Sequence, residues 1–431
     1  MSGLRDRLNR LKPSSPGANP PTVQERAEDH EWIGLDARME RNEWGQFVLR
    51  ERRYSLDYRH GLYALGDLIG HASVLDVLNR SAGSLSGHEA LLFLDTETTG
   101  LGIGAGNVPF MVGIGYYQGE SYVVEQLFIR NPAEELAMLA YLREKLQSFS
   151  RVISYNGRTF DWPVLKNRFI LNRIQLEDRH LHQIDLLYTS RSIWRSTLPS
   201  CRLGTVEEAR LGVLREEDVP GSMAPALYFQ YLAEGNPQAI EGVFDHNERD
   251  ILSLSVLASH VTRLVQGRIR LSELEAGELY RVGAWLDKLE LPELAEQAFR
   301  QLAERNGDEI RELRMPMAAY FKKKGDYRQA VRIWEDSIEE NRNAGKFIPS
   351  VEPFIELAIH YEHRMKNAKQ ALAYAEEALQ AARKRISLAR GDRKQRLLAE
   401  NLQKRIERLM RKVDKQMPML FDVDEEIEPT N

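Results

Sequence analysis

Two carboxylates end a short apolar run near the first quarter of this sequence. Leu91-Leu-Phe-Leu94 leads directly into Asp95-Thr-Glu97. In a strand, side chains two positions apart share one face, so Asp95 and Glu97 would present two anionic oxygen ligands side by side. Mg²⁺ and Mn²⁺ prefer carboxylate and water ligands. Capping a turn or pairing with arginine are the alternatives, and the spacing alone does not decide between them.

Further acidic groups and a histidine follow at two later points. Asp161 comes just after an apolar run at 151–155 and opens a helical pattern, where a helix N-cap is its alternative role. His246 and Asp250 are four residues apart, so they share a face if the stretch 237–266 is helical. Taken alone, such a pair is usually a surface or structural contact.

The elements that must position these groups can be predicted from hydrophobic patterning. Short β-branched and aromatic runs predict strands, and longer periodic stretches predict helices. Alternation of the two types predicts an α/β fold, a mixed sheet flanked by helices. The predicted strands are 91–94, 110–117, 122–129 and 151–155, and the main helices are 132–149, 162–172 and 237–266.

Together, the motifs resemble those of a known superfamily. Asp95-Thr-Glu97-Thr-Thr-Gly-Leu101, then Asn156-x-x-x-Phe160-Asp161, then His246-x-x-x-Asp250 resemble the three exonuclease motifs of DEDD nucleases. This superfamily has a ribonuclease-H-like fold and includes DnaQ-like 3′-5′ exonucleases and polymerase proofreading domains. The third motif departs from the pattern, because it has the spacing of the branch that uses tyrosine but carries His246.

The resemblance extends over about Glu89 to Leu264. With Pro220-Gly221, His246-Asn247 and a helical-repeat tail, the chain looks like the bacterial YprB-like group of ribonuclease-H-like proteins.

This resemblance implies a 3′-5′ exonuclease that hydrolyses phosphodiester bonds of DNA or RNA, most readily at a single-stranded 3′ end. It implies two divalent cations, Mg²⁺ or Mn²⁺, that activate a water and stabilise the leaving oxygen. The implied metal ligands are Asp95, Glu97, Asp161 and Asp250, with His246 as proton acceptor. The implied substrate contacts, for which packing is the alternative role, are Thr98, Leu101, Asn156 and Phe160. Asn156 is also expected to orient the Asp161 carboxylate, and Asp185 to be structural.

Two other functions stay open. One is a non-catalytic adapter that binds nucleic acid or protein and contains a vestigial nuclease domain. The other is a structure-selective endonuclease. The presence of all four acidic residues favours an enzyme, because clustered uncompensated charge has no structural benefit.

The second half of the chain is predicted to be helical throughout. An offset of 35 residues relates two sets of small and aromatic residues, and a third set follows after a longer linker. This period is similar to that of tetratricopeptide repeats, which bind protein partners, and an unrelated helical bundle is the alternative. The three sets are Gly283, Leu286, Ala295 and Phe299; Ala318, Phe321, Ala330 and Trp334; and Ala358, Tyr361, Ala371 and Ala375.

Charge is concentrated at the C-terminus. The stretch 383–415 has thirteen Lys or Arg against four Asp or Glu. It is either a solvated amphipathic helix or a surface that contacts phosphate groups. Beyond it, Gln416 to Phe421 resembles the short peptides that dock on the bacterial sliding clamp, although a tail folded back on the repeats is the simpler interpretation.

The whole chain of 431 residues has a formal net charge of −5 and 42% hydrophobic residues, as expected of an ordinary globular protein. We find no secretory signal and no apolar run of about 20 residues, so we expect a cytoplasmic protein without membrane contact. The single cysteine excludes an internal disulfide. The predicted segments are a polar arm or adapter at 1–58, a helical lead-in at 59–88, a ribonuclease-H-like domain at 89–267, tetratricopeptide-like repeats at 272–385, a basic helix at 386–415 and a flexible acidic tail at 416–431.

Overall fold

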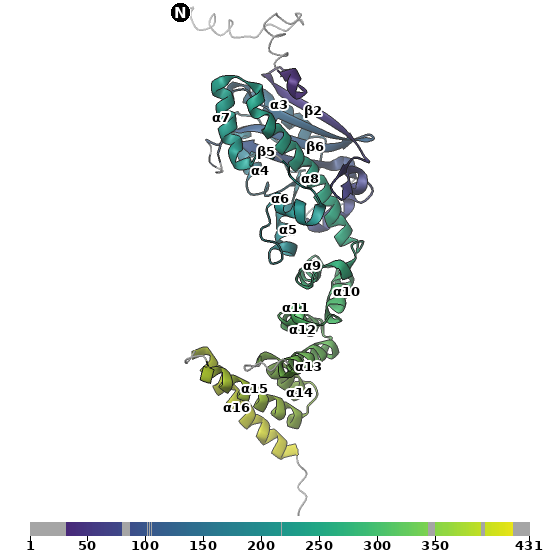
Figure 1. The fold of residues 1–431 in the computed structure, drawn as a ribbon, viewed down its shortest axis with the longest axis vertical. Helices are drawn as coiled ribbons and strands as arrows, with labels where there is room; N and C mark the ends of the chain where they lie inside the picture. Colours follow the sequence, from purple (N-terminus) through teal and green to yellow (C-terminus); the bar gives the residue numbers. More distant parts are fainter. Residues whose placement is uncertain are drawn as a thin grey trace, which may run out of the picture. The chain divides into compact units, whose positions relative to one another are not determined.

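The protein is described by a computed structural model that covers residues 32–79, 87–100, 102, 104, 106–216, 218–343, 350–388 and 393–416 (Figure 1). Its chain separates into two compact units, divided between Ile269 and Arg270. The first unit contains the candidate site, and the described residues of the second form helices and their connections.

A mixed sheet forms the centre of the first unit, as predicted. Its order is β1-β2-β7-β6-β5-β8-β9, and β5 pairs in parallel with β8, as β8 does with β9, whereas the other pairs are antiparallel. The strand that carries the first two carboxylates, β5, therefore lies inside the sheet. The strands are β1 (Ala37–Asn42), β2 (Gly45–Ser55), β5 (Leu91–Thr98), β6 (Pro109–Gln118), β7 (Ser121–Phe128), β8 (Arg151–Ser154) and β9 (His182–Asp185).

Helices cover both faces of this sheet. On β7, Glu125 accepts a hydrogen bond from Tyr141 of α3, whereas the next residue, Gln126, donates one to Asn247 of α8. Because successive side chains of a strand point to opposite faces, α3 and α8 lie on opposite sides. Figure 1 shows α8 lying across the sheet. The helices of this unit are α3 (Glu135–Leu146), α4 (Asp161–Leu171), α5 (Leu186–Trp194), α6 (Leu203–Val206), α7 (Ala224–Glu234) and α8 (Glu241–Val265).

Two glycines on β6 allow α8 to approach the sheet closely. A Cβ atom on Gly113 would lie 2.2 Å from Oδ1 of Asn247, and one on Gly115 would lie 2.5 Å from Cγ2 of Ile251. Neither contact is sterically tolerable, so any side chain here would push α8 away. The position of α8 relative to β5 therefore depends on these two residues.

The N-terminal segments differ from the sequence-based prediction. Residues 37–55 were expected to form an adapter, but they are β1 and β2 of the sheet itself, with β2 paired to β7 from Val48↔Phe128 to Ser55↔Ser121. In the sequence, Arg50 and Arg52 make this segment look like a polar surface stretch rather than a strand of the sheet. In the fold, both arginines pair with Glu248 on α8.

The predicted helical lead-in also differs. The described part of 59–88 contains the short strands β3 (Arg59–His60) and β4 (Tyr63–Ala64), followed by 3₁₀ turns at Leu65–Leu68 and Ala72–Leu78. Leu68 and Leu75 are fully buried, so the apolar spacing reflects packing rather than an α-helix. Gly70, at φ 76°, interrupts the run.

The second unit consists of consecutive helix pairs. The residues that predicted a repeat occupy equivalent places, with Gly283 and Phe299 on the first pair, and Ala318 and Trp334 on the second. All four are buried. This placement supports a repeat, and its assignment as tetratricopeptide stays a prediction. The helices are α9 (Ala276–Lys288), α10 (Pro292–Ala303), α11 (Asp308–Arg311), α12 (Arg314–Lys324), α13 (Tyr327–Asn343), α14 (Glu352–His363), α15 (Ala368–Leu388) and α16 (Arg393–Gln416).

Some predictions fall outside the described residues. These are most of the N-terminal arm, the acidic tail and the clamp-like peptide beyond Gln416. Among the residues that are described, none of the helices combines the length and apolar character needed to cross a bilayer.

Candidate active site

The four predicted carboxylates come from three elements. Asp95 and Glu97 lie on β5, Asp161 is the first residue of α4, and Asp250 lies on α8. Glu97 is only 9% exposed and Asp161 only 5%, so both are nearly removed from water. The β5 pair lies on one face of the strand, as the spacing predicts.

The structure brings these carboxylates close enough to affect one another. Burial and the negative charges of Asp250, Asp161 and Glu97 hold the pKa of Asp95 well above its ordinary value. Burial, followed by repulsion from Asp250 and Asp161, raises the pKa of Glu97 to about 8. Burial raises the pKa of Asp161 to about 6, and it also raises the pKa of Asp250. The cluster therefore holds more negative charge than its protein neighbours neutralise.

Protein donors already engage three of the four groups. Asn247 Nδ2 donates to Oδ2 of Asp95 at 2.8 Å. Thr96 donates its hydroxyl to Oδ1 of Asp161, and Arg215 donates to Oδ1 of Asp250. Within the described residues, no three His, Cys, Asp or Glu side chains form a ready metal-binding group.

The donor chemistry nevertheless fits a hard divalent cation. The bonds from Asn247 and Arg215 take one oxygen each, which leaves Oδ1 of Asp95 and Oδ2 of Asp250 for another ligand. All four groups are carboxylates, the ligands that Mg²⁺ and Mn²⁺ favour, and their raised pKa values show that added positive charge would be stabilising.

A buried polar chain fixes the donor to Asp95. Oδ1 of Asn247 accepts from Gln126 Nε2 at 2.9 Å, and Oε1 of Gln126 accepts from Arg50 Nη1 at 3.4 Å. Asn247 is 0% exposed, Gln126 1% and Arg50 3%. The amide of Asn247 thus has a single favourable orientation, with its NH₂ group toward Asp95. Gly113 provides the space in which this amide lies.

His246 lies between two of the carboxylates. Its Nε2 is 3.9 Å from both Oε1 of Glu97 and Oδ2 of Asp250. Its Nδ1 is 3.0 Å from both oxygens of Asp218. An ionised carboxylate only accepts hydrogen bonds, so Nδ1 carries a hydrogen, and in the neutral form of the ring Nε2 would have its lone pair facing the cluster. The tautomer is inferred from this hydrogen-bonding pattern.

Asp218 is held in its ionised form. Burial alone would raise its pKa, but hydrogen bonds from Arg215 and His246 outweigh this effect and leave the pKa lowered. Arg249 Nη1 also lies 2.7 Å from Oδ1 of Asp218. The carboxylate therefore orients the imidazole ring, a role often filled by an acidic partner of histidine.

Arg215 is the main positive charge beside the cluster. It bridges Asp250, Asp218 and Glu207, the last of which is fully buried. Arg215, Asp218 and Asn247 were given no role in the sequence analysis. Asn247 and Pro220-Gly221 were noted only as family features, and a Cβ on Gly221 would lie 3.1 Å from Nε2 of His246.

The predicted substrate residues have mixed placements. Thr98 is buried and donates to the Gly100 carbonyl at 2.7 Å. In the described part of the chain, Asn156 accepts from Thr159 at 2.8 Å, so the bond to Asp161 expected of it is replaced by that of Thr96. Phe160 directly precedes Asp161 and is half-buried, and Leu101 lies outside the described residues.

Asp185, predicted to be structural, supports the loop before α4. Its carboxylate accepts from the backbone N–H groups of Asn156 at 2.8 Å and Arg158 at 3.2 Å, and caps α5 through Leu187 at 3.0 Å. These bonds connect the end of β9 to the loop that presents Asp161. The contacts are those of a structural residue.

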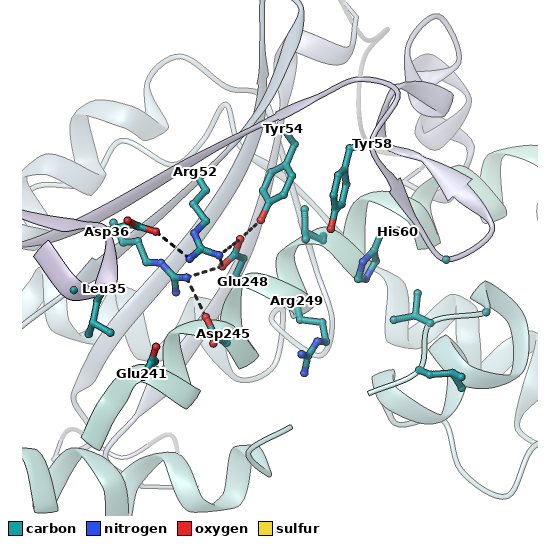
Figure 2. Close-up of a pocket in the computed structure, with 17 residues that line it drawn as sticks. Leu35, Asp36, Arg52, Tyr54, Tyr58, His60, Glu241, Asp245, Glu248 and Arg249 are labelled. Carbon is teal, nitrogen blue, oxygen red and sulfur yellow. Dashed lines mark hydrogen bonds and ion pairs between the residues drawn. The ribbon is translucent and has the colours of Figure 1, made fainter. Parts of the chain in front are cut away.

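A cavity of about 510 Å³ opens on the other side of α8 (Figure 2). Glu248 faces it, because residues two apart on a helix point in nearly opposite directions from Asp250. Figure 2 shows Arg52 directed toward Glu248, which also lies 3.2 Å from Arg50. Arg50 is in turn 3.0 Å from Asp245. These ion pairs hold α8 against β2.

The fold agrees with a comparison to known protein families. Residues 92–262 match the ribonuclease H superfamily. The sheet with its flanking helices is thus a ribonuclease-H-like, nuclease-like fold.

The chain is 33% identical over 342 residues to the uncharacterized protein YprB of Bacillus subtilis (strain 168), covering 78% of this chain and 81% of that protein. It belongs to the YprB family. A solved structure, the family B DNA polymerase from the hyperthermophilic archaeon Pyrobaculum calidifontis, matches 46% of this chain with 14% identity and a TM-score of 0.32. The match spans 29% of that polymerase chain.

Proposed function

We propose that this protein is a divalent-metal-dependent 3′-5′ exonuclease that acts on single-stranded ends of DNA or RNA. The observation that supports this most strongly is the convergence of Asp95, Glu97, Asp161 and Asp250 from three elements. Burial, followed by their mutual repulsion, raises the pKa values of Asp95 and Glu97, which a structural role for these residues does not explain. Ribonuclease-H-like nucleases generally use divalent metal ions.

The four carboxylates are the residues that would hold two such ions, Mg²⁺ or Mn²⁺. When bound, the ions would supply an acidified water for attack on phosphorus and a positive charge for the leaving 3′-oxygen.

His246 accepts the proton of the attacking water in this mechanism. Its Nε2 lies between Glu97 and Asp250, at 3.9 Å from each, where the lone pair faces the cluster. Asp218 accepts a hydrogen bond from Nδ1, which prevents a flip of the imidazole ring and keeps Nε2 directed toward the carboxylates. The departure from the usual spacing of the third motif thus leaves His246 in reach of the reacting groups.

The direct test uses the purified full chain and a single-stranded oligonucleotide labelled at its 5′ end, as DNA and as RNA. With Mn²⁺ or Mg²⁺ we expect a ladder of shortened products, and with chelator none. A single internal cut would instead identify an endonuclease. Absence of cleavage with either metal, together with retained binding, would identify an adapter.

Substitutions assign the residues. Asp95→Asn should abolish both cleavage and Mn²⁺ uptake measured by titration calorimetry, because it removes a charge without changing volume. His246→Ala should lower turnover strongly and leave Mn²⁺ uptake nearly intact, and an equal loss of Mn²⁺ affinity would contradict its role as proton acceptor. Asp178→Asn is the matched control, because this carboxylate pairs with Lys166 on the surface, at 2.7 Å.

A further inference from the structure

Seven of the nine basic residues on the last helix of the second unit fall into two groups. α16 has nine Lys or Arg and three Asp or Glu over Arg393–Gln416. Helical spacing separates these residues by direction, because each residue turns the helix by about 100°. One group faces the neighbouring helices, and the other faces solvent.

The inner group shares one carboxylate partner. Arg405, Arg408 and Lys412 lie 3.4, 2.9 and 2.8 Å from the oxygens of Glu362 on α14, which is only 4% exposed. Three apolar residues of α16 are also buried: Leu402, Ile406 and Leu409. These contacts attach α16 to the helices before it, and they explain why this face is basic.

The outer group has no such partner. Arg393, Lys404, Arg411 and Lys415 are spaced by 11, 7 and 4 residues, so they form one stripe along the helix, opposite its buried face. All four are exposed, and within the described residues none forms an ion pair. At 1.5 Å per residue the stripe, defined as these four residues, extends over about 33 Å.

We propose that this stripe is a sequence-independent docking surface for the phosphodiester backbone of a nucleic acid strand. The four cations outnumber the two exposed carboxylates on the same side of the helix, Glu400 and Glu407. A cationic row of this kind binds phosphate groups, and binding releases the counterions of the strand. The inference rests on the proposed function, because it takes the bound strand to be of the same class as the substrate. It adds a second contact outside the ribonuclease-H-like unit.

A membrane is the less suitable partner. Helices that bind a lipid surface insert an exposed apolar face between the headgroups. The continuous apolar face of α16 is already buried within the unit, and its two exposed large apolar residues, Leu397 and Met410, lie 13 residues apart on different sides of the helix, so they form no second apolar face. A phosphate backbone requires no apolar contact.

The test measures binding without cleavage. A fluorescein-labelled oligodeoxythymidylate of about 30 nucleotides is titrated with the full chain in EDTA, and anisotropy gives the affinity at several salt concentrations. The combined variant Lys404→Gln, Arg411→Gln and Lys415→Gln should bind about tenfold more weakly near physiological salt. The slope of log K against log salt should become shallower by about 2, since each lost single-strand contact contributes about 0.7.

A matched control removes the same charge elsewhere in the unit. The control is the combined variant Lys322→Gln, Lys323→Gln and Lys324→Gln. These three lysines lie at the end of α12, where they pair with Glu356 and Asp287. This control should bind the oligonucleotide like the unmodified chain. Circular dichroism checks that both triple variants keep their helices.

Several results would overturn the inference. The first is that the stripe variant binds the oligonucleotide as tightly as the unmodified chain, or that the control variant loses as much affinity. The second is that the unmodified chain does not bind the oligonucleotide. The third is that the stripe variant loses binding to phosphatidylglycerol vesicles but not to the oligonucleotide. The proposed activity is tested separately with the p-nitrophenyl ester of thymidine 5′-monophosphate, a mononucleotide substrate that has no polynucleotide backbone for the stripe to bind. If the unmodified chain fails to hydrolyse this ester in Mn²⁺, the nuclease proposal fails, whereas the binding result stands by itself.

Discussion

Replacing Glu97 by glutamine should stabilise the metal-free protein at alkaline pH. Burial and the charges of Asp250 and Asp161 raise the pKa of Glu97 from its ordinary 4.5 to about 8. The folded state therefore binds this proton more tightly than the unfolded chain does. The stability that this proton provides is complete below about pH 4.5 and is lost as the pH rises through about 8.

The size of the effect follows from the same shift. At about 1.4 kcal/mol for each pKa unit, ionising Glu97 costs the folded state up to about 5 kcal/mol. This is a ceiling, because the four carboxylates share the cost. Glutamine cannot ionise and avoids it. For a unit of this size about 1 kcal/mol moves the midpoint of thermal unfolding by about 2 °C, so the gain is between about 2 and 10 °C.

Calorimetry of the full chain in EDTA, at about pH 5 and about pH 8.5, is the measurement, because the two units can unfold in separate transitions. Glu97→Gln should raise the midpoint of thermal unfolding at about pH 8.5, and this increase should become smaller at about pH 5. Glu135→Gln is the control, because it removes a carboxylate that is paired with Arg168 and should give no gain. An equal gain at both pH values, or a loss at the higher pH, would refute the electrostatic explanation.

Substitutions at three further residues test the surrounding contacts. Arg215→Ala should destabilise the first unit by about 3 to 5 kcal/mol, because Glu207 stays buried without its partner, and a loss below about 1 kcal/mol in calorimetry would contradict this. Gly113→Ala should cost about 1 to 3 kcal/mol, since its methyl group would lie 2.2 Å from Oδ1 of Asn247; unchanged unfolding would show that α8 shifts freely. Asp218→Ala should lower kcat about tenfold with little change in KM, and Asp218→Asn, which retains an acceptor for Nδ1 of His246, should recover part of it; equal rates in both variants would argue against a positioning role.

The sequence predicted the parts of the site that depend on local spacing. Asp95 and Glu97 share a face because they are two apart on one strand, and His246 and Asp250 because they are four apart on one helix. These relations follow from the local geometry of a strand or a helix, so they do not depend on how the elements pack against one another. The central strands and the helical second unit were predictable for the same reason, since a buried run or an amphipathic period is visible in the sequence.

The supporting residues could not be predicted in this way. Arg50 resembles a surface residue of a strand, and its pairing with Glu248 joins positions far apart in the chain. Asp218 and Arg215 lie in a connecting segment without periodicity, and their roles exist only because that segment lies beside α8. Such contacts are created by tertiary packing, which a single sequence does not encode in any local pattern.

The charge balance of the site links these supporting residues to the proposed chemistry. Arg215 and Arg249 offset part of the negative charge, but Arg215 is shared between Glu207, Asp218 and Asp250. Asp95 receives only the neutral amide of Asn247, and its pKa is held well above its ordinary value. A protein that needed only a stable fold would gain by replacing such a group with a neutral one. The side of the cluster nearest β5 is thus where positive charge is lacking, and it is where a divalent cation would be stabilised most.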